Sequence, residues 1–154
     1  METKKISTGI AGEYFVAGEL SRRGFIASLT LKNTTGIDIL ASNGEKSINI
    51  QVKTRLADKT GGWNLGSKPL DYTSDHNSIF YVLVEASSDQ KDKTINYYII
   101  PKKELNEIVE KEHLAWMSGT QKSGKARKSE MRFLWIKKHT ELEKYRDNWG
   151  ILFI

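Results

Sequence analysis

The chain has 154 residues with a net charge of +5, and 38% of its residues are hydrophobic and 28% charged. This length predicts one domain over residues 1–154, and the composition excludes a disordered chain. Cysteine is absent, which excludes disulfides, thiolate catalysis and cysteine-ligated metals. There is neither a signal-peptide core nor a run of the ~18 apolar residues that a membrane span needs, so we expect a cytoplasmic protein without membrane partners.

The first predicted element is a helix that begins with Ser7 as its N-cap and ends near Arg23, before the stop signal of Gly24. Its buried side is predicted from apolar residues at helical spacing, namely Ile10, Tyr14, Ala17 and Leu20. Glu13 falls inside this stripe, where an ionised carboxylate is costly unless a cation faces it. A salt bridge at the edge of the helix is the alternative interpretation of Glu13 taken alone.

Residues 25–31 are predicted to form a strand, residues 33–36 turn the chain, and a hairpin over residues 36–54 follows. Asn43-Gly44 is typical of a type I′ turn, which needs positive φ at both central residues. A turn at these two residues pairs Asp38 with Asn49. Cross-strand partners share a face, so Asp38 is expected on the same side as Gln51 and Lys53. The apolar residues of the second strand, Ile48, Ile50 and Val52, point to the other side.

The remaining chain is predicted to hold a glycine-rich loop at 59–71, strands at 79–85 and 94–100, and a helix at 102–116. Segments 133–136 and 142–154 are expected to close the fold. This order of elements predicts an α/β fold, in which helices flank a mixed central sheet of about five strands.

Residues 118–132 are polar and basic. A mobile, solvated loop is the more common interpretation of such a run. The alternative is a strip that follows a nucleic-acid backbone.

Glu13, Asp38 and the run Gln51-Val52-Lys53 together resemble the PD-(D/E)xK nuclease superfamily, which has the restriction-endonuclease-like fold. In that family a helix carries an acid, a second strand carries the first motif acid, and the third strand carries (D/E)xK. Two positions depart from the pattern, because Ile37 stands where a proline usually precedes the acid and Gln51 replaces the second acid. The latter resembles the QxK form of Mrr-like restriction enzymes.

The resemblance implies a Mg²⁺-dependent (or Mn²⁺-dependent) DNA endonuclease with Glu13, Asp38, Gln51 and Lys53 as its catalytic residues. It implies that Asp38, Gln51 and the Val52 carbonyl hold the metal, and that Glu13 assists through water or a second ion. Lys53 would orient the nucleophile and contact the scissile phosphate. A member of the same fold that binds nucleic acid or a protein partner without catalysis is the alternative, since the Gln51 amide adds no negative charge.

DNA is the expected partner of this chain, and a homodimer would suit the cutting of both strands. A companion protein is left open. The residues expected to contact nucleic acid lie after the QxK run and in the basic run, and are Arg55, Trp63, Lys122, Lys125, Arg127 and Lys128.

Overall fold

The computed structural model describes residues 2–31, 36–57, 61–67, 78–89, 91–135 and 140–153. Residues 33–35 of the expected turn, part of the expected loop at 59–71, Ile136 and Ile154 lie outside these residues. The elements are α1 (Glu2–Arg22), β1 (Ile26–Leu29), β2 (Ile39–Ser42), β3 (Ser47–Leu56), β4 (Trp63–Gly66), β5 (Ile79–Ala86), β6 (Ile95–Pro101), α2 (Lys102–Met117), β7 (Arg132–Leu134), and the short 3₁₀ helices η3 (Thr140–Tyr145) and η4 (Trp149–Phe153).

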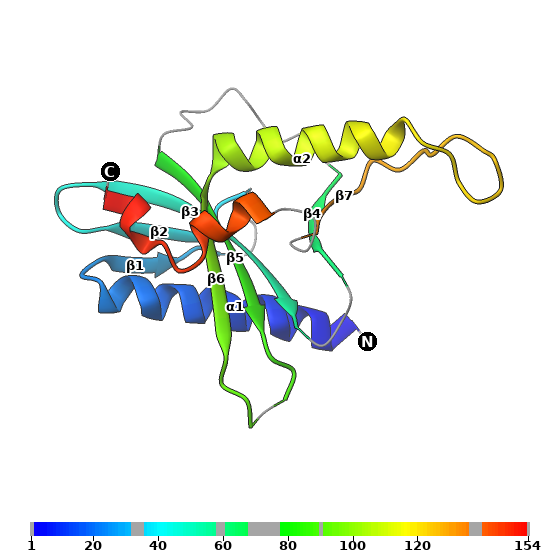
Figure 1. Ribbon diagram of the computed structural model, residues 1–154. Coiled ribbons are helices and arrows are strands. Elements are labelled where there is room, and N and C mark those ends of the chain that lie inside the picture. Colours follow the sequence, from blue (N-terminus) through cyan, green and yellow to red (C-terminus); the bar gives the residue numbers. More distant parts are fainter. Residues whose placement is uncertain are drawn as a thin grey trace.

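The main sheet has five strands in the order β1-β2-β3-β5-β6 (Figure 1). Adjacent strands within the sheet are antiparallel except for β3 and β5, which run parallel and therefore need a crossover connection. A second, two-stranded sheet is formed by β4 and β7. The predicted mixed sheet of about five strands with flanking helices is confirmed.

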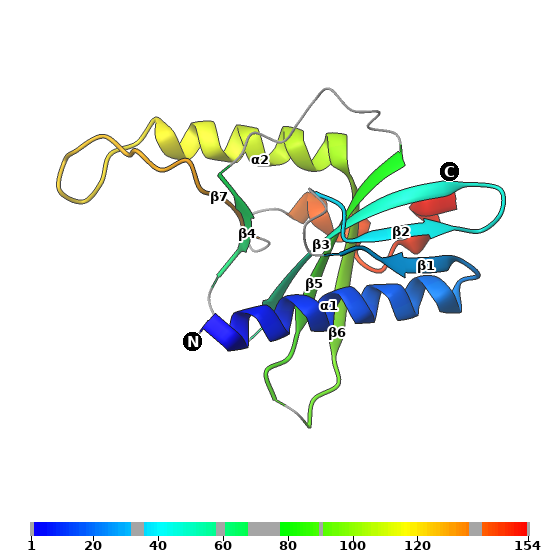
Figure 2. The same cartoon turned by 180° about the vertical axis from the view of Figure 1, so that it is seen from behind.

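Each face of the main sheet has its own apolar core. On one face α1 packs with Val16 and Leu20 against the strands, as the view from behind shows (Figure 2). On the other face Leu105 and Val109 of α2 and Trp63 of β4 close a second cluster. None of the described helices is long and apolar enough to cross a membrane.

The first helix differs from its prediction at its start and in its buried side. It begins at Glu2, because no breaker separates residues 2–6 from Ser7, and Ser7 is therefore no N-cap. Its end is as expected, with Gly24 at a φ of 89°. Tyr14 is 63% exposed, so its predicted burial is wrong. The helix lies on the sheet through Gly12 and two buried apolar residues on the same side, which turns Tyr14 to the surface.

The β2–β3 hairpin has the predicted strands but a different turn. Asn43 pairs with Lys46 through a backbone hydrogen bond of 3.2 Å, so Gly44 and Glu45 are the central residues. Gly44 has a φ of 89°, whereas Asn43 is not among the described residues with positive φ. The side-chain oxygen of Asn43 instead accepts the backbone N–H groups of Glu45 and Lys46. The register thus moves by two residues, which leaves every side chain on its expected face.

Two segments expected to be loops contain regular structure. Trp63 and Leu65 are buried and alternate with exposed Asn64 in strand β4, a pattern hidden in the sequence by the surrounding glycines. After α2, residues 118–131 form an arm that reaches away from the sheet (Figure 1). A turn at its tip is closed by the bond from the Gln121 N–H to the Lys125 carbonyl, at 2.8 Å.

Candidate active site at a fork in the sheet

The main sheet opens into a fork between β2 and β3. The two strands pair from Ser42 and Ser47 to Ile39 and Ile50. Beyond this point β3 continues to Leu56, and no strand among the described residues pairs with it on that side. Strand edges of this kind leave backbone groups free for other partners.

Asp38 occupies the opening of the fork. Its backbone N–H donates to the Ile50 carbonyl at 2.9 Å. Its carboxylate oxygen Oδ2 accepts the backbone N–H of Val52 at 2.7 Å. The side chain of Asp38 therefore takes the position where the next residue of a paired strand would bond.

The neighbouring strand β1 holds Asp38 in this place. Thr30, just after β1, donates its backbone N–H to the Asp38 carbonyl at 2.9 Å. Its hydroxyl donates to the Ile37 carbonyl at 2.6 Å. Asp38 is thus bound to chain segments on both of its sides, which fixes its carboxylate against β3.

Gln51 and Lys53 flank the point where Asp38 meets β3. Both are partly buried. Their register partners on β5 are Tyr81 and Leu83, which belong to the core on the α2 side of the sheet. Side chains on paired strands share a face, so Gln51 and Lys53 project to that side.

Glu13 comes to the same stretch of β3 from the opposite face. Its neighbour Gly12 lies so close to β3 that a Cβ there would be 1.8 Å from the hydroxyl oxygen of Thr54. Glu13 itself is partly buried on the helix flank beside this contact. The fork is the place where groups from the two faces can approach each other, since no neighbouring strand separates them there.

The chemistry of the fork fits a hard divalent cation. The Asp38 carboxylate and the Gln51 amide provide oxygen atoms, and oxygen is the ligand that Mg²⁺ prefers. The Val52 N–H points toward Asp38. Within a strand, the carbonyl of a residue points to the same side as its N–H, so the Val52 carbonyl also faces the fork. The described residues contain no group of three or more His, Cys, Asp and Glu side chains that could hold a metal.

Tyr81 is a residue of this region that the sequence did not single out. It is 4% exposed and is the register partner of Gln51. Burial and the nearby negative charge of Asp38 raise the pKa of Tyr81 to about 12. The phenol therefore stays neutral at physiological pH. The sequence carries no signal for it, because the pairing of β3 with β5 joins residues that are distant along the chain.

Arg55 and Trp63, two of the residues expected to contact nucleic acid, are engaged within the protein. Trp63 is 1% exposed, and its indole N–H donates to the Val84 carbonyl at 3.0 Å. The guanidinium of Arg55 lies 4.6 Å from the centre of the Trp63 ring, pairs with the Glu85 carboxylate and donates to the Gly61 carbonyl. Trp63 therefore presents no open ring face to a base, and the nucleic-acid role of Arg55 stays a prediction.

The other expected contact residues lie on the arm after α2. Lys122, Lys125 and Lys128 are exposed there. Arg127 folds back instead, donating to the Trp116 carbonyl at 2.8 Å with its guanidinium 5.0 Å from the ring centre. The structure therefore separates the predicted residues into three regions: the fork, the β4 layer and the arm.

Comparison with known proteins identifies the fold. No protein-family model matches the sequence, and no curated protein is significantly similar to it. Among solved structures, the chain is similar to a bacterial homing endonuclease, I-Ssp6803I, with a TM-score of 0.53 and 14% identity. The similarity covers 94% of this chain and 90% of that chain. The chain thus has the fold of a known endonuclease.

Proposed function

We propose that this protein is a metal-dependent DNA endonuclease of the PD-(D/E)xK type, in its QxK form. The observation that carries the proposal is the fork, where the Asp38 carboxylate bonds β3 between Gln51 and Lys53. The likeness to a homing endonuclease supports the same class of reaction. The net charge of +5 supports a polyanionic substrate.

The proposed roles follow from position. Asp38, Gln51 and the Val52 carbonyl would hold Mg²⁺ or Mn²⁺, and Glu13 would complete the site from α1. The bound ion would supply a Lewis acid that activates water and offsets the charge developing on the phosphate. The Lys53 ammonium would hold the attacking water and bind a phosphate oxygen. The hydrogen bond from the Val52 N–H holds the Asp38 carboxylate in this orientation.

The test is cleavage of plasmid and branched DNA by the purified protein, with Mg²⁺, with Mn²⁺ and with EDTA. Lys53→Ala and Asp38→Asn should each lower the cleavage rate by about a hundredfold or more, the usual loss when one such charge-stabilising group is removed. Asp38→Asn keeps an oxygen for the Val52 N–H, so the fold should survive. Lys91→Ala, in an exposed turn, is the matched control and should cut like the wild type.

Gln51→Glu adds the acid that the motif lacks. Because the charge of the ligands tunes metal affinity, this variant should reach half-maximal cleavage at roughly tenfold less Mg²⁺. Equal cutting by the Lys53→Ala and wild-type proteins would reveal a contaminating nuclease. DNA binding without any metal-dependent cutting would instead establish the alternative, a nuclease fold that serves as a binding module.

A further inference from the structure

A groove with exposed aromatic side chains runs between α2 and the segment that leads into β7. We define the aromatic groove by Trp116 on α2 and by Met131, Phe133 and Trp135 on the facing segment. All four side chains are between 38% and 41% exposed. The cavity has a volume of about 830 Å³, within the range of about 300 to 1,000 Å³ typical of ligand sites.

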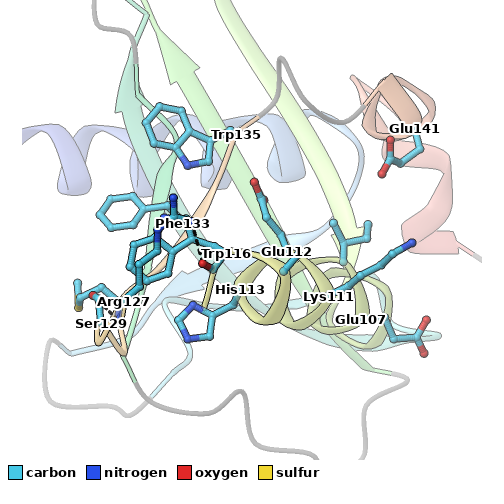
Figure 3. A pocket seen from close by; sticks show the side chains of 13 residues that line it. Glu107, Lys111, Glu112, His113, Trp116, Arg127, Ser129, Phe133, Trp135 and Glu141 are labelled. Atoms are coloured by element: carbon cyan, nitrogen blue, oxygen red, sulfur yellow. Dashed lines mark hydrogen bonds between the residues drawn. The ribbon is translucent and has the colours of Figure 1, made fainter. Parts of the chain in front are cut away.

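The two ends of the aromatic groove differ in character. Figure 3 shows the rings of Trp116 and Phe133 beside Arg127 at one end, and Glu107 and Lys111 toward the other. Exposed apolar surface of this kind on a monomer marks an interaction site. Glu112 and Glu141 also line the groove, and each is engaged with another group of the protein. Glu107 and Glu141 lie away from the aromatic end, whereas Glu112 lies one helical turn before Trp116 and near the aromatic side chains (Figure 3).

The aromatic end adjoins the basic arm, residues 118–131. Lys122, Lys125 and Lys128 of the arm are exposed. None of the ion pairs found among the described residues includes them. The Arg127 guanidinium lies over the Trp116 ring and joins the arm to the groove. Ammonium groups beside flat, accessible rings are the combination that binds single-stranded nucleic acid, with phosphates on the cations and bases stacked on the rings.

We infer that the aromatic groove and the basic arm bind an unpaired segment of DNA, with its bases against Phe133 and Trp135 and its phosphates on the arm lysines. Bases can stack on such rings only when they have left the duplex. The groove lies on the α2 side of the sheet, the side to which Gln51 and Lys53 project. The inference rests on the proposed function, which makes DNA the substrate. It adds that the protein prefers DNA with unpaired nucleotides.

A second copy of the chain is the other occupant that such an apolar surface suggests. Charge argues against it at the aromatic end. Two copies that met there would bring their lysine-rich arms together, and like charges repel. DNA would instead neutralise them. The arm therefore favours a polyanion as occupant.

The experiment measures binding of fluorescent DNA to the full chain in EDTA, where no cutting occurs. The probes are a single strand, the same sequence as a duplex, and a duplex with an unpaired flap. We expect the single strand and the flap to bind more tightly than the duplex. Phe133→Leu and Trp135→Leu keep apolar volume but remove the ring faces on which the bases are placed, and each should weaken single-strand binding by about tenfold. Phe153→Leu, an exposed aromatic in η4, is the matched control.

Two further measurements separate the outcomes. Lys122→Ala with Lys125→Ala should reduce the salt dependence of binding, whereas Lys91→Ala with Lys93→Ala should not. Sedimentation of the groove variants reports on a second copy. The inference is overturned if the duplex binds as tightly as the single strand, if the aromatic variants bind like the wild type, or if those variants change only self-association.

Failure of this inference is distinct from failure of the proposed function. Lys53-dependent cutting with normal DNA binding by the groove variants would overturn the inference alone. Groove-dependent binding of single strands by a wild-type protein that never cuts would overturn the proposed catalysis and leave the inference standing.

Discussion

Replacing Gly12 with alanine would place a methyl group against β3. The added Cβ would lie 1.8 Å from the Thr54 hydroxyl oxygen, 2.9 Å from its Cβ and 3.1 Å from its Cγ2. Rotation of Thr54 cannot relieve the contact, because its Cβ is itself too close. The helix would have to move away from the strand.

The expected cost follows from two opposing effects. Overpacking in a core costs about 1–3 kcal/mol. Alanine gains about 1 kcal/mol over glycine within a helix. The contact is very short, so we expect Gly12→Ala to lose about 1–2 kcal/mol of unfolding free energy. Gly18→Ala is the matched control, because a Cβ there meets nothing within 4 Å, and it should gain about 1 kcal/mol.

The assay is urea denaturation followed by circular dichroism. Adding Thr54→Ala to Gly12→Ala removes the two outer atoms of the clash and should recover part of the loss. Gly12→Ala should also slow DNA cutting, since α1 carries Glu13 at the next position. If Gly12→Ala were as stable as Gly18→Ala, the close packing of α1 on β3 would be refuted.

Two further outcomes are expected. Burial raises the pKa of Tyr81 and of Tyr97 from 10.0 to about 12, so the unfolded chain loses these protons first. The contribution of each tyrosine to the free energy of unfolding is intact below pH 10 and should fall by up to about 1.4 kcal/mol per pH unit above it. Urea denaturation at pH values from 10 to 12 measures this fall. If the free energy of unfolding of Tyr81→Phe fell with pH as steeply as that of the wild type, the reasoning would be contradicted. Trp63→Phe removes the bond to the Val84 carbonyl and should cost about 1–3 kcal/mol of stability. Its DNA affinity should match the wild type, and weaker binding by the folded variant would show that Trp63 is accessible.

The hairpin that carries Asp38 and Lys53 was predictable because its signals are local. Apolar and polar residues alternate along β3, and a glycine marks the turn. The precise register was not predictable, since Asn43 bonds the turn with its side chain instead of adopting positive φ. The face of each residue was nevertheless correct, because a shift of two residues preserves alternation.

The fork itself could not be predicted from the sequence. It depends on where β2 leaves β3 and on the parallel pairing of β3 with β5, which are contacts between distant residues. The approach of Gly12 to Thr54 is of the same kind.

The aromatic residues show a similar limit. Trp63 and Trp116 are the same residue type, yet one is buried and the other is 40% exposed. The pairing of β4 with β7 buries Trp63. This pairing joins residues that are distant along the chain, so the composition does not predict it.

The bond between Asp38 and Val52 has a second consequence, for the solubility of the protein. A strand edge with free backbone groups can pair with an edge of another molecule and start aggregation. At the fork, the Asp38 carboxylate covers the first free N–H of β3 with a negative charge. Alanine at this position would uncover that edge, so an Asp38→Ala protein should precipitate more readily than Asp38→Asn. A residue proposed for metal binding thus also keeps neighbouring molecules from adding a strand to the sheet.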